Sequence, residues 1–266
     1  MITYSYSLTR NDIPLYGIER RIMQLIDRTL KALTTLSRHA NGLSVSELSE
    51  KLEIPMSSTH RILTSLKKNN FVIQDEDTKR YRLGYKVFSL CSGIQKNSSL
   101  ILAARPQMKE LAKAIKKTII LCVMENESII NLDCIENQES SMYMVKVGSE
   151  MPLYVTSAGR VFAAYMDRAS VLEIFRHTKI KAETPYTKTN IEELCVELDD
   201  IREKGYAIID EELQIGIQGV ACPIFDVNGK VIAVIAFTSI KRADPINKEM
   251  ILKLQESAEK ISEAIL

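Results

Sequence analysis

The 266-residue sequence predicts a mixed α/β protein of the α+β class with two domains. Three observations support this prediction. A pattern of two short helices followed by a charged hairpin occupies residues 43–84, and β-prone runs are mixed with helical stretches after residue 117. Residues 1–86 contain 14 Lys and Arg against 9 Asp and Glu, whereas residues 87–266 contain 21 against 25. A basic segment therefore precedes an acidic one, although the whole chain has a net charge of only +1.

The first domain, residues 18–86, begins with a long amphipathic helix in which apolar residues recur from Ile22 to Leu36. Ser44 precedes Glu47 by the spacing of a capping box, which predicts a helix over residues 45–52. Pro55 then opens a second helix over residues 55–68, at a position where its missing N–H costs nothing. Two helices joined by so short a turn, with a further helix before them, are typical of a helix-turn-helix.

The second helix of this pair has a polar N-terminal half. Ile62, Leu63 and Leu66 share one face and are predicted to be buried. The exposed face is left to Ser57, Ser58, Thr59, His60 and Arg61. This part of a helix-turn-helix enters the major groove, so the sequence predicts a protein that binds double-stranded DNA. For His60, a contact with DNA and a role in local packing fit the pattern equally well.

A wing follows the second helix. Residues 71–73 and 81–83 are β-prone, and the polar residues 75–78 between them predict a turn. Lys79, Arg80 and Arg82 are expected to point from the returning strand toward DNA phosphates. The acidic tip of the hairpin is unsuited to DNA, so the wing is expected to contact DNA through its base.

Residues 87–98 are predicted to form a linker helix, with Val87, Phe88, Leu90, Cys91 and Ile94 as an apolar stripe. The stripe favours a homodimer, or a dimer of dimers; docking on the second domain is the alternative. Two recognition helices in a dimer would address two half-sites. Within the following helical stretch, residues 100–117, Pro106 predicts a kink or a break.

The second domain, residues 99–266, reads as an antiparallel sheet with helices. Strands are predicted at residues 119–124, 128–135, 142–147, 206–210, 219–225 and 230–239, with an Asn-Gly turn between the last two. Helices are predicted at residues 158–166, 169–177 and 190–204, and a terminal helix from Asp244 onward. Met142 to Met144 fit either a pocket wall or core packing.

Several classes of function are disfavoured. The five cysteines, Cys91, Cys122, Cys134, Cys195 and Cys222, form no CxxC pair, and the three histidines are scattered, so we expect no disulfide framework, metal site or cofactor. No convergent acid, base or nucleophile set indicates an enzyme. The chain has no apolar run of roughly 20 residues and a polar N-terminus, so we expect a cytoplasmic protein without a membrane partner.

Two features indicate a small-molecule site. The turn at residues 156–160, Thr-Ser-Ala-Gly-Arg, leaves backbone amides free at a helix start, which attracts an anion such as a carboxylate, although small residues also serve close packing. A Gly-bearing loop at residues 216–219 follows a strand end, and loops of that kind often cover a ligand. Arg160 is expected at the surface or at a subunit interface.

Taken together, these motifs identify the sequence as similar to the isocitrate-lyase-regulator (IclR) family of bacterial transcription regulators. The similarity runs from Asp27 to the C-terminus. It rests on residues 58–63 (STHRIL), 81–84 (YRLG), 158–160 (AGR), 205–206 (GY) and 224–226 (IFD), with Arg28, Val147-Gly148, Pro152 and Glu212 at matching positions. The order and spacing of these pieces carry the resemblance.

The resemblance implies a winged helix-turn-helix, a linker helix and a GAF-like domain that binds a small organic acid and thereby alters operator binding. It places backbone amides of Ser157 and Ala158 in the effector site, together with the positions of Ile209, Gly219, Ala236 and Thr238. Relatives commonly have Asp or Ser where Ile209 stands, and of these positions only Thr238 keeps a side-chain donor. Asp210 would replace the missing acid if the strand register slipped by one residue. We therefore expect an effector with a more apolar body, such as an aromatic or branched acid.

Two other functions remain open at this level. One is an architectural DNA binder whose second domain only oligomerises, and the other is an enzyme with an accessory DNA-binding module. A second domain filled by its own side chains would favour the architectural role. The operator, the effector and the sign of regulation are outside what the sequence determines.

Overall fold

The computed structural model describes residues 15–137 and 146–265. The chain divides into two compact units, one ending at Asn97 and the other beginning at Ser98. Each unit has its own buried apolar cluster, or clusters, so each is described by itself. The division into residues 18–86, 87–98 and 99–266 stays a prediction. No helix in the described ranges is long and apolar enough to cross a membrane.

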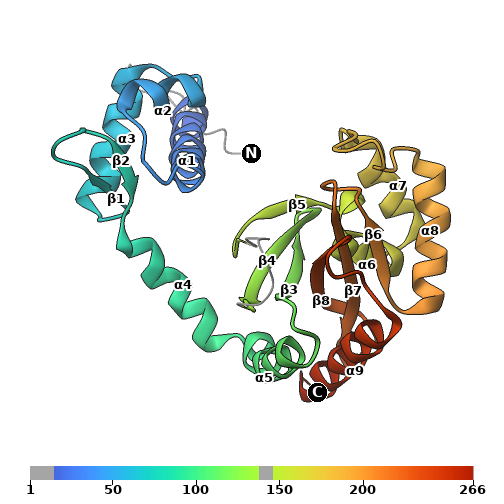
Figure 1. Ribbon diagram of the computed structural model, residues 1–266. Helices are drawn as coiled ribbons and strands as arrows, with labels where there is room; N and C mark the ends of the chain where they lie inside the picture. Colours follow the sequence, from blue (N-terminus) through green and yellow to red (C-terminus); the bar gives the residue numbers. More distant parts are fainter. Residues whose placement is uncertain (1–14, 138–145, 266) are drawn as a thin grey trace, which may run out of the picture. The chain divides into compact units, whose positions relative to one another are not determined.

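The first unit contains helices α1 (Leu15–Ser37), α2 (Val45–Leu52), α3 (Met56–Lys68) and α4 (Tyr85–Asn97), and strands β1 (Val72–Gln74) and β2 (Tyr81–Leu83) (Figure 1). Both hydrogen bonds of the capping box form between Ser44 and Glu47, so α2 has the predicted bounds. Strands β1 and β2 pair antiparallel as the wing. The predicted winged helix-turn-helix is therefore confirmed.

The core of this unit lies where α1, α2, α3 and the wing meet. Leu36, Leu48, Leu63 and Tyr81 are buried there, and Ile54 fills the turn between α2 and α3. Full burial of each such side chain contributes about 1.5–3 kcal/mol to the stability of the fold. The three helices therefore place the outer face of α3 on a rigid base.

Helix α4 leaves its apolar residues uncovered. Tyr85 is 87% exposed, Phe88 is 70% exposed and Leu90 is 53% exposed. Phe88 and Leu90 belong to the stripe for which the sequence suggested a second copy of the chain, with docking on the second domain as the alternative.

The second unit is built on a six-stranded, fully antiparallel sheet of order β5-β4-β3-β8-β7-β6. Its strands are β3 (Ile119–Glu125), β4 (Ser128–Ile135), β5 (Glu150–Pro152), β6 (Ala207–Asp210), β7 (Ile217–Phe225) and β8 (Val231–Ile240). The predicted hairpins at 125–127 and 226–229 are both confirmed. The predicted strand at 142–147 lies largely outside the described residues, while β5 was not predicted.

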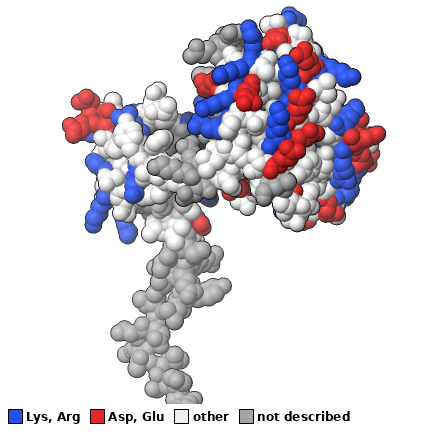
Figure 2. Space-filling view, turned by 90° about the horizontal axis from the view of Figure 1, so that it is seen from below, with Lys and Arg blue, Asp and Glu red and all other residues white. Residues whose placement is uncertain are grey.

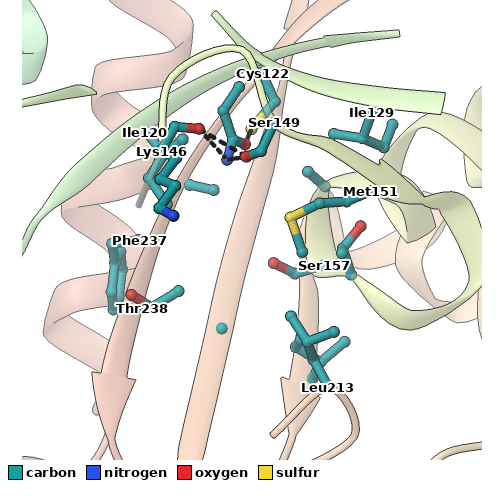
Figure 3. Close-up of a pocket in the computed structure, with 16 residues that line it drawn as sticks. Ile120, Cys122, Ile129, Lys146, Ser149, Met151, Ser157, Leu213, Phe237 and Thr238 are labelled. Atoms are coloured by element: carbon teal, nitrogen blue, oxygen red, sulfur yellow. Dashed lines mark hydrogen bonds between the residues drawn. The ribbon is translucent and has the colours of Figure 1, made fainter. Parts of the chain in front are cut away.

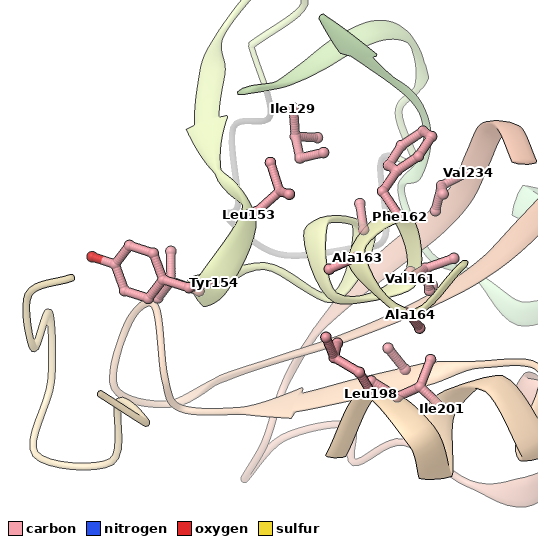
Figure 4. Close-up of a cluster of buried hydrophobic side chains, with 14 of the residues drawn as sticks. Ile129, Leu153, Tyr154, Val161, Phe162, Ala163, Ala164, Leu198, Ile201 and Val234 are labelled. Atoms are coloured by element: carbon pink, nitrogen blue, oxygen red, sulfur yellow. The ribbon is translucent and has the colours of Figure 1, made fainter. Parts of the chain in front are cut away.

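Helices cover both faces of this sheet. Helices α6 (Ser157–Tyr165), α7 (Arg168–His177) and α8 (Ile191–Lys204) pack with one apolar cluster, which includes Phe162, Leu198 and Val234 (Figure 4). Helices α5 (Ser99–Ile115) and α9 (Lys248–Ile265) pack with a second cluster. A short 3-10 turn, Leu153–Val155, leads into α6. The same strands contribute to both clusters, because alternate residues of each strand point to opposite faces of the sheet.

Helix α5 runs through Pro106 without interruption, so the predicted break is wrong. Proline removes one helix hydrogen bond, but Ala104, Met108 and Leu111 are buried along one face of α5. Packing of an apolar face supplies most of the stability of a helix in a protein, and here it outweighs the lost bond.

Local signals at the ends of α8 are confirmed. The Asn190 side chain accepts hydrogen bonds from the amides of Glu192 and Glu193. Gly205 ends the helix with φ of 74°, a left-handed conformation that glycine adopts without steric cost. Helix α9 begins at Lys248, a few residues after the predicted start at Asp244.

Candidate DNA-binding surface and ligand pocket

The N-terminal half of α3 presents a polar surface. Ser57, His60 and Arg61 are exposed, and Ser58 is half-buried. Arg61 forms no ion pair within the described part of the chain, so its guanidinium is available to an external anion. The outward face of α3 therefore has the small and basic side chains that a recognition helix needs.

Thr59 does not belong to this surface. Its side chain is fully buried, and its hydroxyl donates to the carbonyl of Pro55 at 3.3 Å. The expectation that Thr59 is exposed is wrong because Thr59, Ile62, Leu63 and Leu66 follow helical spacing and all face the core. Sequence reasoning placed it by polarity, although its methyl group suits the core.

The wing keeps two of its three predicted cations exposed. Lys79 and Arg82 are exposed, and neither forms an ion pair within the described residues. Arg80 is different, because its guanidinium binds Glu47 at 2.9 Å and the carbonyl of Gly42 at 3.1 Å. The expectation that Arg80 points toward phosphates is corrected: it ties the wing to the capping box of α2.

The second unit contains a cavity of about 180 Å³ between the sheet and the start of α6 (Figure 3). Most of its wall is apolar, and none of the described lining residues is Asp or Glu. The lining residues are Ile120, Cys122, Ile129, Asn131, Lys146, Ser149, Met151, Thr156, Ser157, Ala158, Ile209, Leu213, Gly219, Ala236, Phe237 and Thr238. Six of the seven predicted effector residues are among them.

The N-terminus of α6 supplies hydrogen-bond donors to this cavity. Thr156 caps the helix by accepting from the amide of Gly159 at 3.0 Å. The amides of Ser157 and Ala158 come earlier in the first turn, and neither is bonded within the described residues. Both residues are more than nine-tenths buried, so a ligand that enters can satisfy donors that otherwise lack partners.

Gly159 is required at this turn by close packing. A Cβ atom there would lie 2.2 Å from the carbonyl oxygen of Leu153, closer than two nonbonded atoms can approach. The glycine therefore lets the 3-10 turn contact α6 directly. The small residues of this motif serve packing as well as the free amides.

Three predicted residues form one row across the sheet. Gly219 on β7 pairs with Ile209 on β6 and with Thr238 on β8. A Cβ atom at Gly219 would lie 3.1 Å from Cγ1 of Ile209 and 3.2 Å from Oγ of Ser157. Ile209 therefore occupies the space beside the glycine, which makes this end of the pocket apolar.

Asp210 is outside the pocket. Strand β6 alternates between buried and exposed residues, so Asp210 faces away from Ile209. Its carboxylate binds Lys241 at 2.8 Å and accepts from Gln218 at 3.1 Å. The register slip that would have made Asp210 an effector ligand does not occur, and this prediction is corrected.

Polar groups gather at the other end of the pocket, where the sequence did not place them. Asn131 donates to Oγ of Ser149 at 3.0 Å, and Ser149 donates to the carbonyl of Lys146 at 2.7 Å. The thiol of Cys122 donates to Oδ1 of Asn131 at 3.4 Å. Val147-Gly148, which contributed to the resemblance, was the available signal for this turn.

Arg160 is fully buried, which corrects the expectation of a surface position. Its guanidinium donates to the carbonyl of Tyr154 at 2.7 Å, to Glu212 at 2.6 Å and to Glu197. Lys188 completes the network by binding Glu197 at 2.7 Å. A buried guanidinium needs such partners. Here the network connects α6 with α8 and with Glu212, which precedes Leu213 of the pocket wall.

The pocket is poorly equipped for nucleophilic or metal chemistry. Burial raises the pKa of the Cys122 thiol to about 12, so this group stays protonated near neutral pH. Burial also raises the pKa of Cys222 far above its usual range. Within the described ranges, no cluster of His, Cys, Asp and Glu could hold a metal ion.

Comparison with known proteins identifies both units. Residues 25–76 match the IclR helix-turn-helix domain, and residues 93–263 match the C-terminal domain of bacterial transcriptional regulators of the IclR type. The chain is 32% identical over 222 residues to the HTH-type transcriptional regulator KdgR of Escherichia coli, covering 83% of this chain and 84% of KdgR.

Solved structures agree with this assignment. An IclR transcriptional regulator from Alicyclobacillus acidocaldarius superimposes with a TM-score of 0.82 at 28% identity, over 91% of this chain and 99% of that one. An IclR homolog from Microbacterium hydrocarbonoxydans, solved with 4-hydroxybenzoate, has the same fold, with a TM-score of 0.80 at 20% identity over 91% and 98%. The chain thus belongs to the IclR family of DNA-binding bacterial transcriptional regulators.

Proposed function

We propose that this regulator binds its operator through α3 and the wing, and that a small carboxylic acid with an apolar body alters this binding from the pocket of the second unit. The observation that carries the proposal is the mostly apolar pocket into which the amides of Ser157 and Ala158, both in buried residues, are free to donate. A carboxylate is the ligand group that such a helix N-terminus favours.

The size and polarity of the pocket support this ligand class. A cavity of roughly 150 Å³ holds benzene in an engineered protein, so about 180 Å³ accommodates a ring or a short branched chain with its carboxylate. Ile209, Leu213 and Met151 offer apolar contacts to the body of the ligand. A very small polar acid would leave these surfaces uncovered. The 4-hydroxybenzoate held by the Microbacterium homolog belongs to the same chemical class.

On the DNA side, the proposal assigns base and phosphate contacts to the exposed residues alone. Ser57, Ser58, His60 and Arg61 would face the major groove, while Lys79 and Arg82 would contact phosphates. The exposed stripe of α4, with Phe88 and Leu90, supports pairing of two chains, so that two copies of α3 address two half-sites.

Binding to labelled DNA from the region upstream of the chain's own gene tests the proposal. Fluorescence anisotropy is recorded with the full chain, first without ligand and then with a series of aromatic, branched and very small carboxylic acids. We expect specific binding that changes with an aromatic or branched acid, and thermal stabilisation of the protein by the same acid. Glyoxylate as the best stabiliser would contradict the assigned ligand class.

A matched variant tests the pocket separately from DNA contact. Gly219→Val places side-chain atoms against Ile209 and Ser157, where even a Cβ atom is crowded. The variant is expected to bind DNA but to lose its response to the acid. An unchanged response would move the effector site elsewhere, and ligand-independent DNA binding by the unaltered protein would favour the architectural role.

A further inference from the structure

Among the described residues, the ligand pocket has positive charge in two places and no carboxylate in its lining. The start of α6 contributes the partial positive charge of a helix N-terminus, about half a unit, together with the free amides of Ser157 and Ala158. Lys146 contributes a full positive charge from the turn before β5. The raised pKa of Cys122 keeps its thiol neutral.

The backbone of Lys146 is fixed at the polar end of the pocket. Its carbonyl accepts from Ser149 at 2.7 Å and from Asn131 at 3.4 Å. In Figure 3 the Lys146 side chain lies among the lining residues, on the opposite side of the pocket from Ser157. Its ammonium forms no ion pair or hydrogen bond within the described residues.

The buried and half-buried cations among the described residues of this unit are paired. Lys117 binds Asp244, Arg160 binds Glu197 and Glu212, and Lys241 binds Asp210 and Glu211. Lys146 is exposed instead and lines the pocket, so its ammonium is available to an anionic partner from outside the chain.

We propose that the pocket binds a small organic dicarboxylate with an apolar body, and that Lys146 determines the preference for a dicarboxylate over the matching monocarboxylate. One carboxylate meets the amides of Ser157 and Ala158, and the second meets the ammonium of Lys146. This inference rests on the proposed function, because it concerns the ligand of the same pocket.

The expected preference is modest because Lys146 is exposed to solvent, where an ion pair is weaker than in the interior. The second carboxylate also loses some of its hydration on entry. An exposed ion pair corresponds to an affinity difference of about threefold to fivefold.

The experiment compares matched acids on the full chain. Glutarate is paired with pentanoate, and isophthalate with benzoate, and each dissociation constant is measured by isothermal titration calorimetry at constant ionic strength. Three proteins are used: the unaltered chain, Lys146→Met, and Lys179→Met as a control. Lys179 is exposed and does not line the pocket.

In the unaltered chain and in Lys179→Met, the dicarboxylate of at least one pair is expected to bind about threefold to fivefold more tightly than its monocarboxylate. In Lys146→Met this ratio is expected to fall to about one, mainly through loss of dicarboxylate affinity. A circular dichroism melting curve that matches that of Lys179→Met shows that the variant is folded.

Two outcomes overturn the inference and leave the proposed function standing. Monocarboxylates could bind and alter DNA binding without any dicarboxylate preference, or the preference could persist in Lys146→Met. If no acid of either kind binds, both the inference and the acid-responsive function fail.

Discussion

The two units use their cations in opposite ways. In the first unit, Arg61, Lys79 and Arg82 are exposed and form no ion pair within the described residues. In the second unit, Arg160 and Lys117 are buried, and each binds a carboxylate. Figure 2 shows the same contrast on one face: Lys, Arg, Asp and Glu intermingle over the second unit, whereas acidic side chains of the first unit gather at one edge.

The contrast has a physical reason. A buried charge must be paired because its desolvation otherwise costs several kcal/mol. An exposed cation is solvated, so it needs no partner within the chain and can bind an external anion. An exposed unpaired cation is therefore available to a negatively charged ligand where other contacts also hold that ligand. In the first unit that ligand is DNA, and in the second unit we propose the same role for Lys146 because it lines the pocket.

The largest expected effect concerns the buried network. Arg160→Met leaves Glu212 buried without its main partner, and its side chain is only 4% exposed. We expect the second unit to be destabilised by roughly 3–5 kcal/mol, the usual cost of breaking a buried ion pair from one side. Urea unfolding of the full chain, followed by circular dichroism, measures this as a lower transition midpoint.

A second variant separates charge from packing. In Arg160→Met/Glu212→Gln the uncompensated charge is gone, so part of the lost stability is expected to return. Arg61→Met, an exposed arginine in the first unit, serves as the control and should change stability by less than about 0.5 kcal/mol. Equal destabilisation by Arg160→Met and Arg61→Met would contradict the claim that buried cations of the second unit stabilise the fold while exposed cations of the first unit do not.

The intermediate effect concerns DNA affinity. Arg61→Ala is expected to weaken operator binding and to lower the slope of log affinity against log salt by about one, because one phosphate contact is lost. Thr59→Ser is the matched control on the same helix, since Thr59 is buried and keeps its hydroxyl in the variant. Anisotropy titrations at several salt concentrations measure both variants, and an unchanged slope for Arg61→Ala would remove it from the DNA surface.

The smallest effect concerns the exposed ion pair of the first unit. Hydrogen bonds from Ser44, followed by that from Arg80, lower the pKa of Glu47 from 4.5 to about 2. Because the folded pKa is below the unfolded one, the ionised carboxylate stabilises the fold above pH 4.5, and this contribution is lost as the pH falls toward about 2.

Glu47→Gln tests this dependence. The variant should be less stable than the unaltered chain at pH 6, and the difference should shrink as the pH approaches 2, because Gln does not titrate in this range. Thermal unfolding at a series of pH values provides the measurement. A difference that stays constant from pH 6 to pH 3 and below would show that ionisation of Glu47 contributes nothing.

Much of the fold could be predicted because its signals are local. The capping box at Ser44 fixed the start of α2, and the Asn190 cap with Gly205 fixed both ends of α8. Strand β4 and the two hairpins followed from β-prone runs and turn residues. Strand β5 was not predicted because it has only three residues, too few for alternation to show.

The candidate site was predicted only in part. Ser157 and Ala158 could be placed because a turn of small residues before a helix is visible in the sequence, and the resemblance supplied Ile209, Gly219, Ala236 and Thr238. Asn131, Ser149 and Lys146 were missed because their place in the pocket depends on the pairing of β4 with β5. A sequence pattern contains no record of such long-range pairing.

The sequence by itself determined the two-domain α+β architecture, the helix-turn-helix with its wing, and the turn of small residues before α6, because caps, turns and hydrophobic periodicity act over a few residues. Only the tertiary structure decided that Thr59 and Arg160 are buried, that Arg80 is bound to Glu47, that Asp210 faces away from the pocket, and that Lys146 lines it. From the local sequence alone, each of these polar side chains could be either exposed to solvent or paired within the protein. Contacts with segments distant in the sequence determine which of the two occurs.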